Sequence, residues 1–115
     1  MKKILFLIAL PLIFALCKKE TTTLPASATS ITMIYQMTQC ADAWQNEPNY
    51  FNDKAATLKT YLKKQGITAI DVTVVQDCSN AAVCAACTCA GCDLATVKVN
   101  ANDVAVMEKL KFVKK

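Results

Sequence analysis

Five cysteines crowd into 15 residues of this 115-residue chain, and they constrain its fold more than any other feature. They are spaced C-x5-C-x2-C-x-C-x2-C from Cys78 to Cys92, and Cys40 lies upstream. The residues between them are mostly small, so the backbone can fold tightly around the sulfurs. A folded body of roughly 75 residues buries a modest core and usually needs an added constraint. The cysteines are the candidates for supplying it.

The first 16 residues have the composition of an export signal. Lys2 and Lys3 are basic, and 4–16 form an uncharged apolar run that only Pro11 interrupts. This run is shorter than the ~20 residues that a membrane-spanning helix needs, but it has the length of a signal-peptide core. We expect a signal peptide at 1–16, a lipidated cysteine with a flexible tether at 17–30, and a cysteine-rich domain at 31–115.

The segment Ile13–Cys17 resembles the lipobox of bacterial lipoproteins, in which the cysteine thiol is acylated and becomes the new N-terminus. It departs from the usual motif at Leu16, where that family has a small residue. The resemblance implies that Cys17 is the lipidation site and that the membrane is a partner through the lipid anchor. It also implies a location in the cell envelope, facing the periplasm or the exterior. Two acyl chains would give stable attachment.

Structural disulfides are the first of three interpretations of the other six cysteines, Cys40, Cys78, Cys84, Cys87, Cys89 and Cys92. An exported domain meets an oxidising compartment, the number is even, and each bridge adds ~2–4 kcal/mol to stability. One arrangement joins Cys40 to Cys78 or to the cluster, while the others pair within the loop. A bridge between Cys87 and Cys89 would be strained because one residue separates them.

A metal site and a redox site are the other two interpretations. Cys84, Cys87, Cys89 and Cys92 could surround zinc or copper, because thiolates suit both ions. These four ligands crowd into nine residues of a chain without histidine, so we expect no cofactor and keep zinc or copper as the alternative. Cys84-Ala-Ala-Cys87 has the form of a thiol oxidoreductase motif, but no amphipathic helix follows it.

Apolar periodicity predicts three strands and two helices. The strands are expected over 31–38, 67–76 and 95–99, with Ile70, Val72 and Val74 facing one way in the second. The first helix is expected to start at Asn52 or Asp53 and to stop before Gly66, with Phe51, Ala55, Leu58 and Leu62 as its buried stripe. The second is expected to be capped by Asn100 or Asn102 and to bury Val106, Met107, Leu110 and Val113.

The order β-α-β-Cys loop-β-α predicts an α/β (α+β) two-layer sandwich, a three-stranded mixed sheet with two helices on one face. A strand-helix-strand unit implies a crossover between parallel strands, and the third strand is expected to return antiparallel. The expected architecture is ferredoxin-like without the last strand.

A few other side chains are weaker candidates for a site. Asp42 and Trp44 beside Cys40 could form a binding surface, but Trp44 is more simply explained as a cover over the sheet edge or the disulfides. Three acidic residues fit structural positions, which are a helix cap, an outward strand residue and a turn: Asp53, Asp71 and Asp77.

The charges exclude a nucleic-acid partner. From residue 18 onward, 11 lysines and 9 acidic residues give a net charge of +2, and there is no arginine for bidentate recognition of phosphates or bases. The basic end fits a last helical turn, where cations complement the helix dipole, better than a patch for lipid headgroups. Its residues are Lys109, Lys111, Lys114 and Lys115.

The folded part resembles small cysteine-rich bacterial lipoproteins. These pair a Cys-Ala-Asp-x-Trp-like segment (Cys40–Trp44) with a C-x2-C-x-C cluster (Cys84, Cys87, Cys89) and a closing Asp-Val…Lys-Leu helix (Asp103–Leu110). The resemblance implies the architecture and an even cysteine count, and it implies no activity. Without a histidine or a recognisable catalytic set, we expect no enzyme but a binding or adaptor module for a protein or small ligand. An envelope metal-binding protein and a thiol oxidoreductase are the alternatives.

Overall fold

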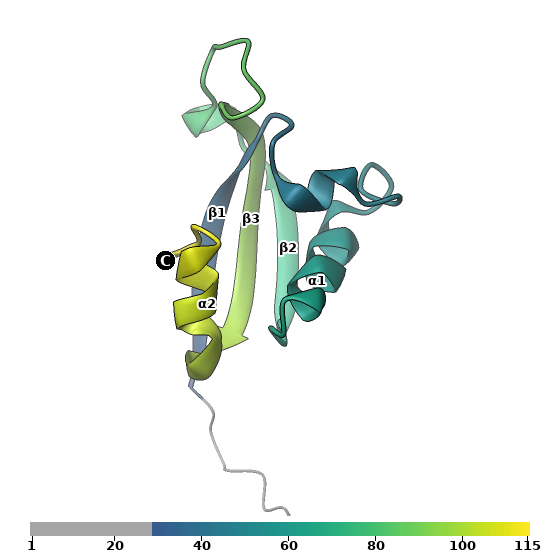
Figure 1. Ribbon diagram of the computed structural model, residues 1–115. Helices are drawn as coiled ribbons and strands as arrows, with labels where there is room; N and C mark the ends of the chain where they lie inside the picture. The colour runs from purple at the N-terminus through teal and green to yellow at the C-terminus, as the bar shows by residue number, and fades with distance from the viewer. Residues whose placement is uncertain (1–28) are drawn as a thin grey trace, which may run out of the picture.

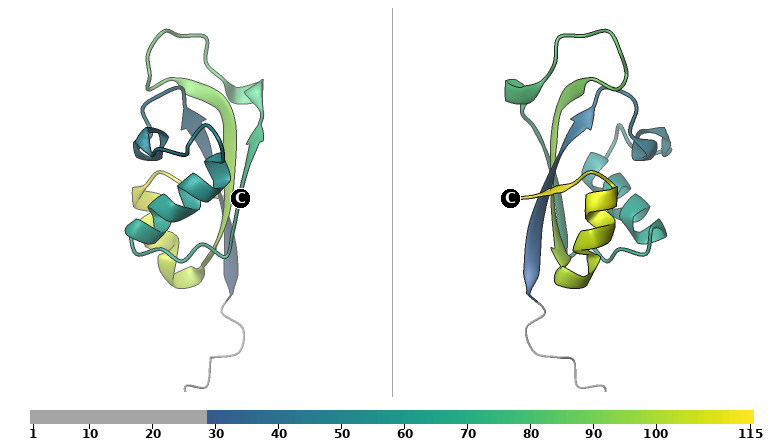
Figure 2. Two further views of the ribbon diagram at one scale, coloured as in Figure 1. Left: turned by 90° about the vertical axis from the view of Figure 1, so that its right-hand side faces the viewer. Right: turned by 60° about the vertical axis from the view of Figure 1, so that its left-hand side comes forward.

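The computed structural model describes residues 29–115, in which two α-helices cover one face of a four-stranded sheet (Figure 1). The elements are β1 (Ser30–Thr38), the 3-10 helix η1 (Ala43–Asn46), α1 (Lys54–Lys64), β2 (Asp71–Gln76), the 3-10 helix η2 (Cys78–Asn80), β3 (Ala90–Asn100), the 3-10 helix η3 (Ala101–Asp103), α2 (Val104–Lys109) and β4 (Val113–Lys114). Figure 2 shows both helices on the same side of the sheet. No helix of these described residues is long and apolar enough to cross a membrane. The expected signal peptide and Cys17 lie outside the described residues.

The sheet has the neighbour order β2-β3-β1-β4, and each neighbouring pair is antiparallel. The prediction of an α+β body with two helices is confirmed, as is the antiparallel return of β3. The prediction of a three-stranded mixed sheet is wrong, because β3 lies between the parallel strands β1 and β2 and because β4 adds a fourth strand. Burial explains the central place of β3, since Ala95, Val97 and Val99 are fully buried, whereas β2 leaves Val75 52% exposed.

The core lies between the sheet and the helices. Met33 of β1 is opposite Val97 of β3, and both side chains are fully buried. Leu58 and Leu62 of α1 and Met107 of α2 cover them from the helical layer. Burial of each such side chain contributes roughly 1.5–3 kcal/mol, so this layer supplies most of the driving force for folding.

Helix α1 begins and ends as its sequence indicates. Asp53 Oδ1 accepts a hydrogen bond of 2.8 Å from the Ala56 N–H, and Gly66 follows the helix with φ at 80°. The placement of Phe51 on the buried stripe is wrong, because Phe51 is 88% exposed. The chain turns over Asn49 before the cap, which puts Tyr50 in the buried position instead.

Helix α2 is shorter than predicted at its C-terminal end. It stops at Lys109, where the Lys111 N–H bonds to the Glu108 carbonyl and the Phe112 N–H bonds to the Met107 carbonyl. This is the Schellman motif, and Lys111 provides its positive φ of 68°. The chain therefore reverses, which buries Phe112.

Four side chains of the predicted second helix have other positions. Val113 belongs to β4 and is 58% exposed, and Val106 is 38% exposed. Neither Asn100 nor Asn102 is the cap of α2, because the residue that precedes this helix is Asp103. Met107 is buried and Leu110 is half-buried, as predicted.

Two strand boundaries also differ from the predictions. The second strand begins at Asp71 rather than at residue 67, and Ile70 is 48% exposed instead of sharing the inner face with Val72 and Val74. The third begins at Ala90 rather than at residue 95, because β1 is long enough to pair with it as far as Thr38. The longer third strand brings the last cysteine into the sheet.

Candidate functional site

The connection from β2 to β3, residues 77–89, carries the cysteine cluster, and we call it the cysteine loop. The prediction of disulfide bonds is confirmed, because all six cysteines of the described domain are paired. Cys40 is joined to the cluster, one of the arrangements that we expected, and Cys87 and Cys89 are not bonded to each other. The pairs are Cys40–Cys87, Cys78–Cys92 and Cys84–Cys89.

Each disulfide joins a different pair of segments. Cys40–Cys87 spans 47 residues and ties the end of β1 to the cysteine loop, with Cα atoms 4.5 Å apart. Cys78–Cys92 spans 14 residues and joins η2 to the start of β3. Cys84–Cys89 spans five residues and closes the tip. The loop is therefore held to the sheet at two places and internally at a third.

Backbone hydrogen bonds reinforce the attachment of the cysteine loop to β1. The Gln39 N–H donates to the Cys89 carbonyl at 2.8 Å, and the Cys40 N–H donates to the Cys87 carbonyl at 3.1 Å. The residues of the tip, 82–88, are nevertheless exposed, and Val83 is fully so. From residue 78 to residue 92 the chain carries no charged side chain. The tip of the loop thus presents a fixed, uncharged and largely apolar surface.

The disulfide pairing separates the four cysteines of the metal interpretation. Cys84, Cys87, Cys89 and Cys92 belong to three different disulfides, and a sulfur in a disulfide is not the thiolate that zinc or copper binds. Residues 29–115 contain no group of three or more His, Cys, Asp or Glu side chains that could hold a metal ion. Cys84 and Cys87 have different partners, so they do not form the closed pair of an oxidoreductase.

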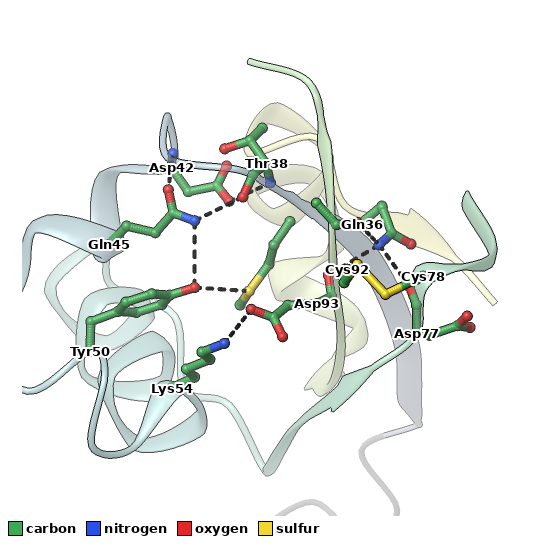
Figure 3. A network of polar contacts seen from close by, with 12 residues as sticks. Gln36, Thr38, Asp42, Gln45, Tyr50, Lys54, Asp77, Cys78, Cys92 and Asp93 are labelled. Atoms are coloured by element: carbon green, nitrogen blue, oxygen red, sulfur yellow. Dashed lines mark hydrogen bonds and ion pairs between the residues drawn. A yellow bond between two sulfur atoms is a disulfide. The ribbon is translucent and has the colours of Figure 1, made fainter. Parts of the chain in front are cut away.

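A polar network beneath the cysteine loop was not predicted (Figure 3). The buried Asp42 carboxylate accepts a hydrogen bond from the Tyr35 hydroxyl at 2.7 Å and another from the Thr38 N–H at 2.8 Å. Gln45 Oε1 accepts from the Asp42 N–H, and Gln45 Nε2 donates to the Thr38 carbonyl, each at 2.9 Å. The spacing Asp42-x-x-Gln45 is typical of a helix start and was the signal that could have revealed this network.

The network fixes the protonation state of Tyr35. Burial first, and the hydrogen bond to the Asp42 carboxylate second, raise the pKa of Tyr35 above its usual value. The hydroxyl therefore stays protonated and remains a donor to Asp42 over the whole physiological range.

A second set of contacts anchors the base of the cysteine loop. Gln36 Nε2 donates to the Gly91 carbonyl at 2.7 Å, beside the Cys78–Cys92 disulfide (Figure 3). Lys54 forms an ion pair with Asp93, and the hydrogen bond to that carboxylate raises the pKa of Lys54. The ion pair therefore joins helix α1 to the start of β3 next to Cys92, the disulfide-bonded cysteine of that strand.

The two remaining acidic candidates have the structural positions that we predicted. Asp77 Oδ1 accepts from the Ser79 N–H at 2.9 Å, which lowers the pKa of Asp77. Asp71 is exposed on β2.

Trp44 is a core residue in contact with three aromatic rings. Its ring centroid lies 5.5 Å from that of Tyr35, 5.4 Å from that of Tyr61 and 6.2 Å from that of Phe112. Such tilted and edge-on pairs add to the stability that burial provides.

No protein-family model, no curated protein and no solved structure matches this chain.

Proposed function

We propose that this chain is a lipid-anchored cell-envelope protein, a non-enzymatic binding or adaptor module that presents the cysteine loop to a partner. One observation carries the proposal: the chain enters the domain at Ser30, at one end of β1, and the cysteine loop is fixed at the other end through Cys40 (Figure 1). Nine strand residues at about 3.3 Å each separate the two ends by roughly 30 Å. An anchor at Cys17 would therefore attach to the end opposite the loop.

The surface of the cysteine loop supports a role in recognition. Its exposed tip has no charged side chain that would lose its hydration when a partner binds. Three disulfides already fix the conformation of the loop. A preorganised surface loses little conformational entropy when a partner binds, which favours affinity.

The lipid anchor is tested by replacing Cys17 in the full chain. Wild-type protein made in a bacterium should partition into the detergent phase of Triton X-114 and incorporate labelled fatty acid. Cys17→Ser should move to the aqueous phase and lose the label. The matched control, Cys84→Ser with Cys89→Ser, should stay in the detergent phase, because those sulfurs belong to the loop. Detergent partitioning of Cys17→Ser with its label intact would refute the anchor.

The recognition surface is tested by photocrosslinking in intact cells. A photoreactive amino acid at Val83, on the exposed tip, should give a discrete crosslinked product with one protein. The control position is Thr68, which is exposed in the connection from α1 to β2 at the other end of the sheet. Products that are the same from both positions, or absent from both, would contradict presentation of the loop to a protein partner.

The ferredoxin-like assignment belongs to the same proposal. The element order β1-α1-β2-β3-α2-β4 and the neighbour order β2-β3-β1-β4 support it, with β4 as a short closing strand that we had not expected. Backbone NMR of the domain should give slow amide exchange for the paired residues of β4, and rapid exchange there would limit the fold to three stable strands.

A further inference from the structure

A cleft on the helical face lies beside the cysteine loop, and Thr88 of the exposed tip is one of its lining residues. It occupies about 350 Å³ between η1, α1 and the end of α2, within the range of small-molecule sites. The side chains that matter for its chemistry are Tyr35, Asp42, Trp44, Tyr61, Lys109 and Lys111.

Aromatic side chains form the inner part of this cleft. Tyr35 and Tyr61 are half-buried on either side of Trp44, which is 4% exposed. The Trp44 Nε1–H is buried and has no hydrogen-bond acceptor among residues 29–115. This donor is enclosed by the protein, so it takes no part in the contacts that the cleft offers to a ligand.

Two lysines line the cleft. Lys109 and Lys111 are exposed, and no carboxylate of the described residues comes within ion-pair distance of either, unlike Lys54, Lys64 and Lys114. Lys111 also holds a positive φ of 68° at a position where glycine would be less strained. The Schellman motif accounts for the conformation of Lys111, and its exposed side chain leaves the ammonium group available to a ligand.

The one carboxylate of the cleft does not neutralise these lysines. Asp42 is buried, and its two oxygens accept hydrogen bonds from the Tyr35 hydroxyl and the Thr38 N–H. The accessible charge of the cleft is therefore positive.

We propose that this cleft binds a small carboxylate with a flat apolar body. The carboxylate would lie at the rim with Lys109 and Lys111, where ammonium groups donate charge-assisted hydrogen bonds. The flat body would pack against Tyr35 and Tyr61, whose rings contact the buried Trp44. This inference goes beyond the proposed function, because it depends neither on the anchor nor on a partner at the loop.

The single tryptophan of the chain makes the proposal directly measurable. The full-length mature protein in detergent is titrated with phenylacetate while Trp44 emission is recorded. A saturable change at up to millimolar concentration is the expected result. Neutral 2-phenylethanol and inorganic phosphate should each produce no saturable change, since one lacks the charge and the other lacks the flat body.

Charge variants complete the test. Lys109→Gln with Lys111→Gln should weaken phenylacetate binding by about tenfold or more, as expected for the loss of two charge-assisted contacts. The control Lys59→Gln with Lys63→Gln changes two exposed lysines of α1 and should bind as the wild type does. Thermal unfolding establishes that both variants are folded. The proposal is overturned if phenylacetate gives no saturable change, if either comparison ligand binds as tightly, or if both double variants bind like the wild type.

Discussion

At Lys111 the backbone adopts a positive φ of 68°, which the Schellman motif at the end of α2 requires. A positive φ costs a residue with a Cβ about 1 kcal/mol, and glycine avoids most of it. Lys111→Gly should raise the free energy of unfolding in urea by about 0.5–1 kcal/mol. Lys111→Ala removes the same side chain but keeps the Cβ, so it should bring no gain. Equal gains in both variants would assign the effect to the side chain instead of the backbone.

Tyr35 should make the domain sensitive to high pH. Its pKa is raised in the folded state, so above pH ~10 a free tyrosine ionises in the unfolded chain while Tyr35 stays protonated in the native one. The stability that this residue contributes is full below that pH. It is lost progressively as the pH rises from there toward the raised pKa of the folded state. Tyr35→Phe should be less stable than the wild type at pH 8, and the difference should shrink by pH 11. A difference that stays constant over this range would show that Tyr35 does not titrate differently in the two states.

Among the elements, the cysteine loop provides the clearest ranking of stability. Loop-closure entropy grows with the length of the closed segment, and the three bridges span 47, 14 and five residues. Replacing each pair by alanine should cost about 4, 3 and 2 kcal/mol respectively, measured by urea unfolding of the three variants. The order tests the role of Cys40–Cys87 as the tie between β1 and the loop. A smaller loss for Cys40–Cys87 than for Cys84–Cys89 would contradict that role.

Gly91 of β3 lies close to the backbone of β1. A Cβ at this position would lie 3.2 Å from the Thr38 carbonyl oxygen, a backbone atom that cannot move aside without disturbing β1. Gly91→Ala should therefore lower the free energy of unfolding by about 1–3 kcal/mol. Ala90→Gly is the matched control on the neighbouring residue. It should cost no more than about 1 kcal/mol, because it adds no atom and only weakens the strand. If Gly91→Ala lowers the free energy of unfolding by no more than Ala90→Gly does, β1 and β3 can separate locally to admit the added methyl group.

Local signals in the sequence predicted elements well and their ends less well. Asp53 and Gly66 bound α1 because a side-chain acceptor and a positive φ are properties of single residues. The end of α2 was missed because its positive-φ position is held by Lys111 and not by glycine. The sheet order was also missed, because pairing of β3 with both β1 and β2 is a long-range property that periodicity does not encode.

The candidate site was predictable only as a set of residue types. The even number of cysteines was read from the composition, and the attachment of Cys40 to Cys78 or to the cluster was left open. The choice of Cys87 as its partner depends on how the loop folds back. The cleft was not predicted at all, since Asp42, Tyr61 and Lys111 come from three segments that only the tertiary fold brings together.

The molecule as a whole has two ends joined by β1, one where the chain enters the domain and one where disulfides fix the cysteine loop. We propose a lipid anchor at Cys17, and the domain contains three disulfides. Intact mass spectrometry of the protein extracted from bacterial membranes, alkylated without prior reduction, measures both together. We predict a chain that begins at Cys17, carries added acyl groups and no alkyl groups, and lacks two hydrogens for each of three disulfides. A chain that still begins at Met1, has no acyl mass, or carries alkyl groups on four or more cysteines would contradict the account.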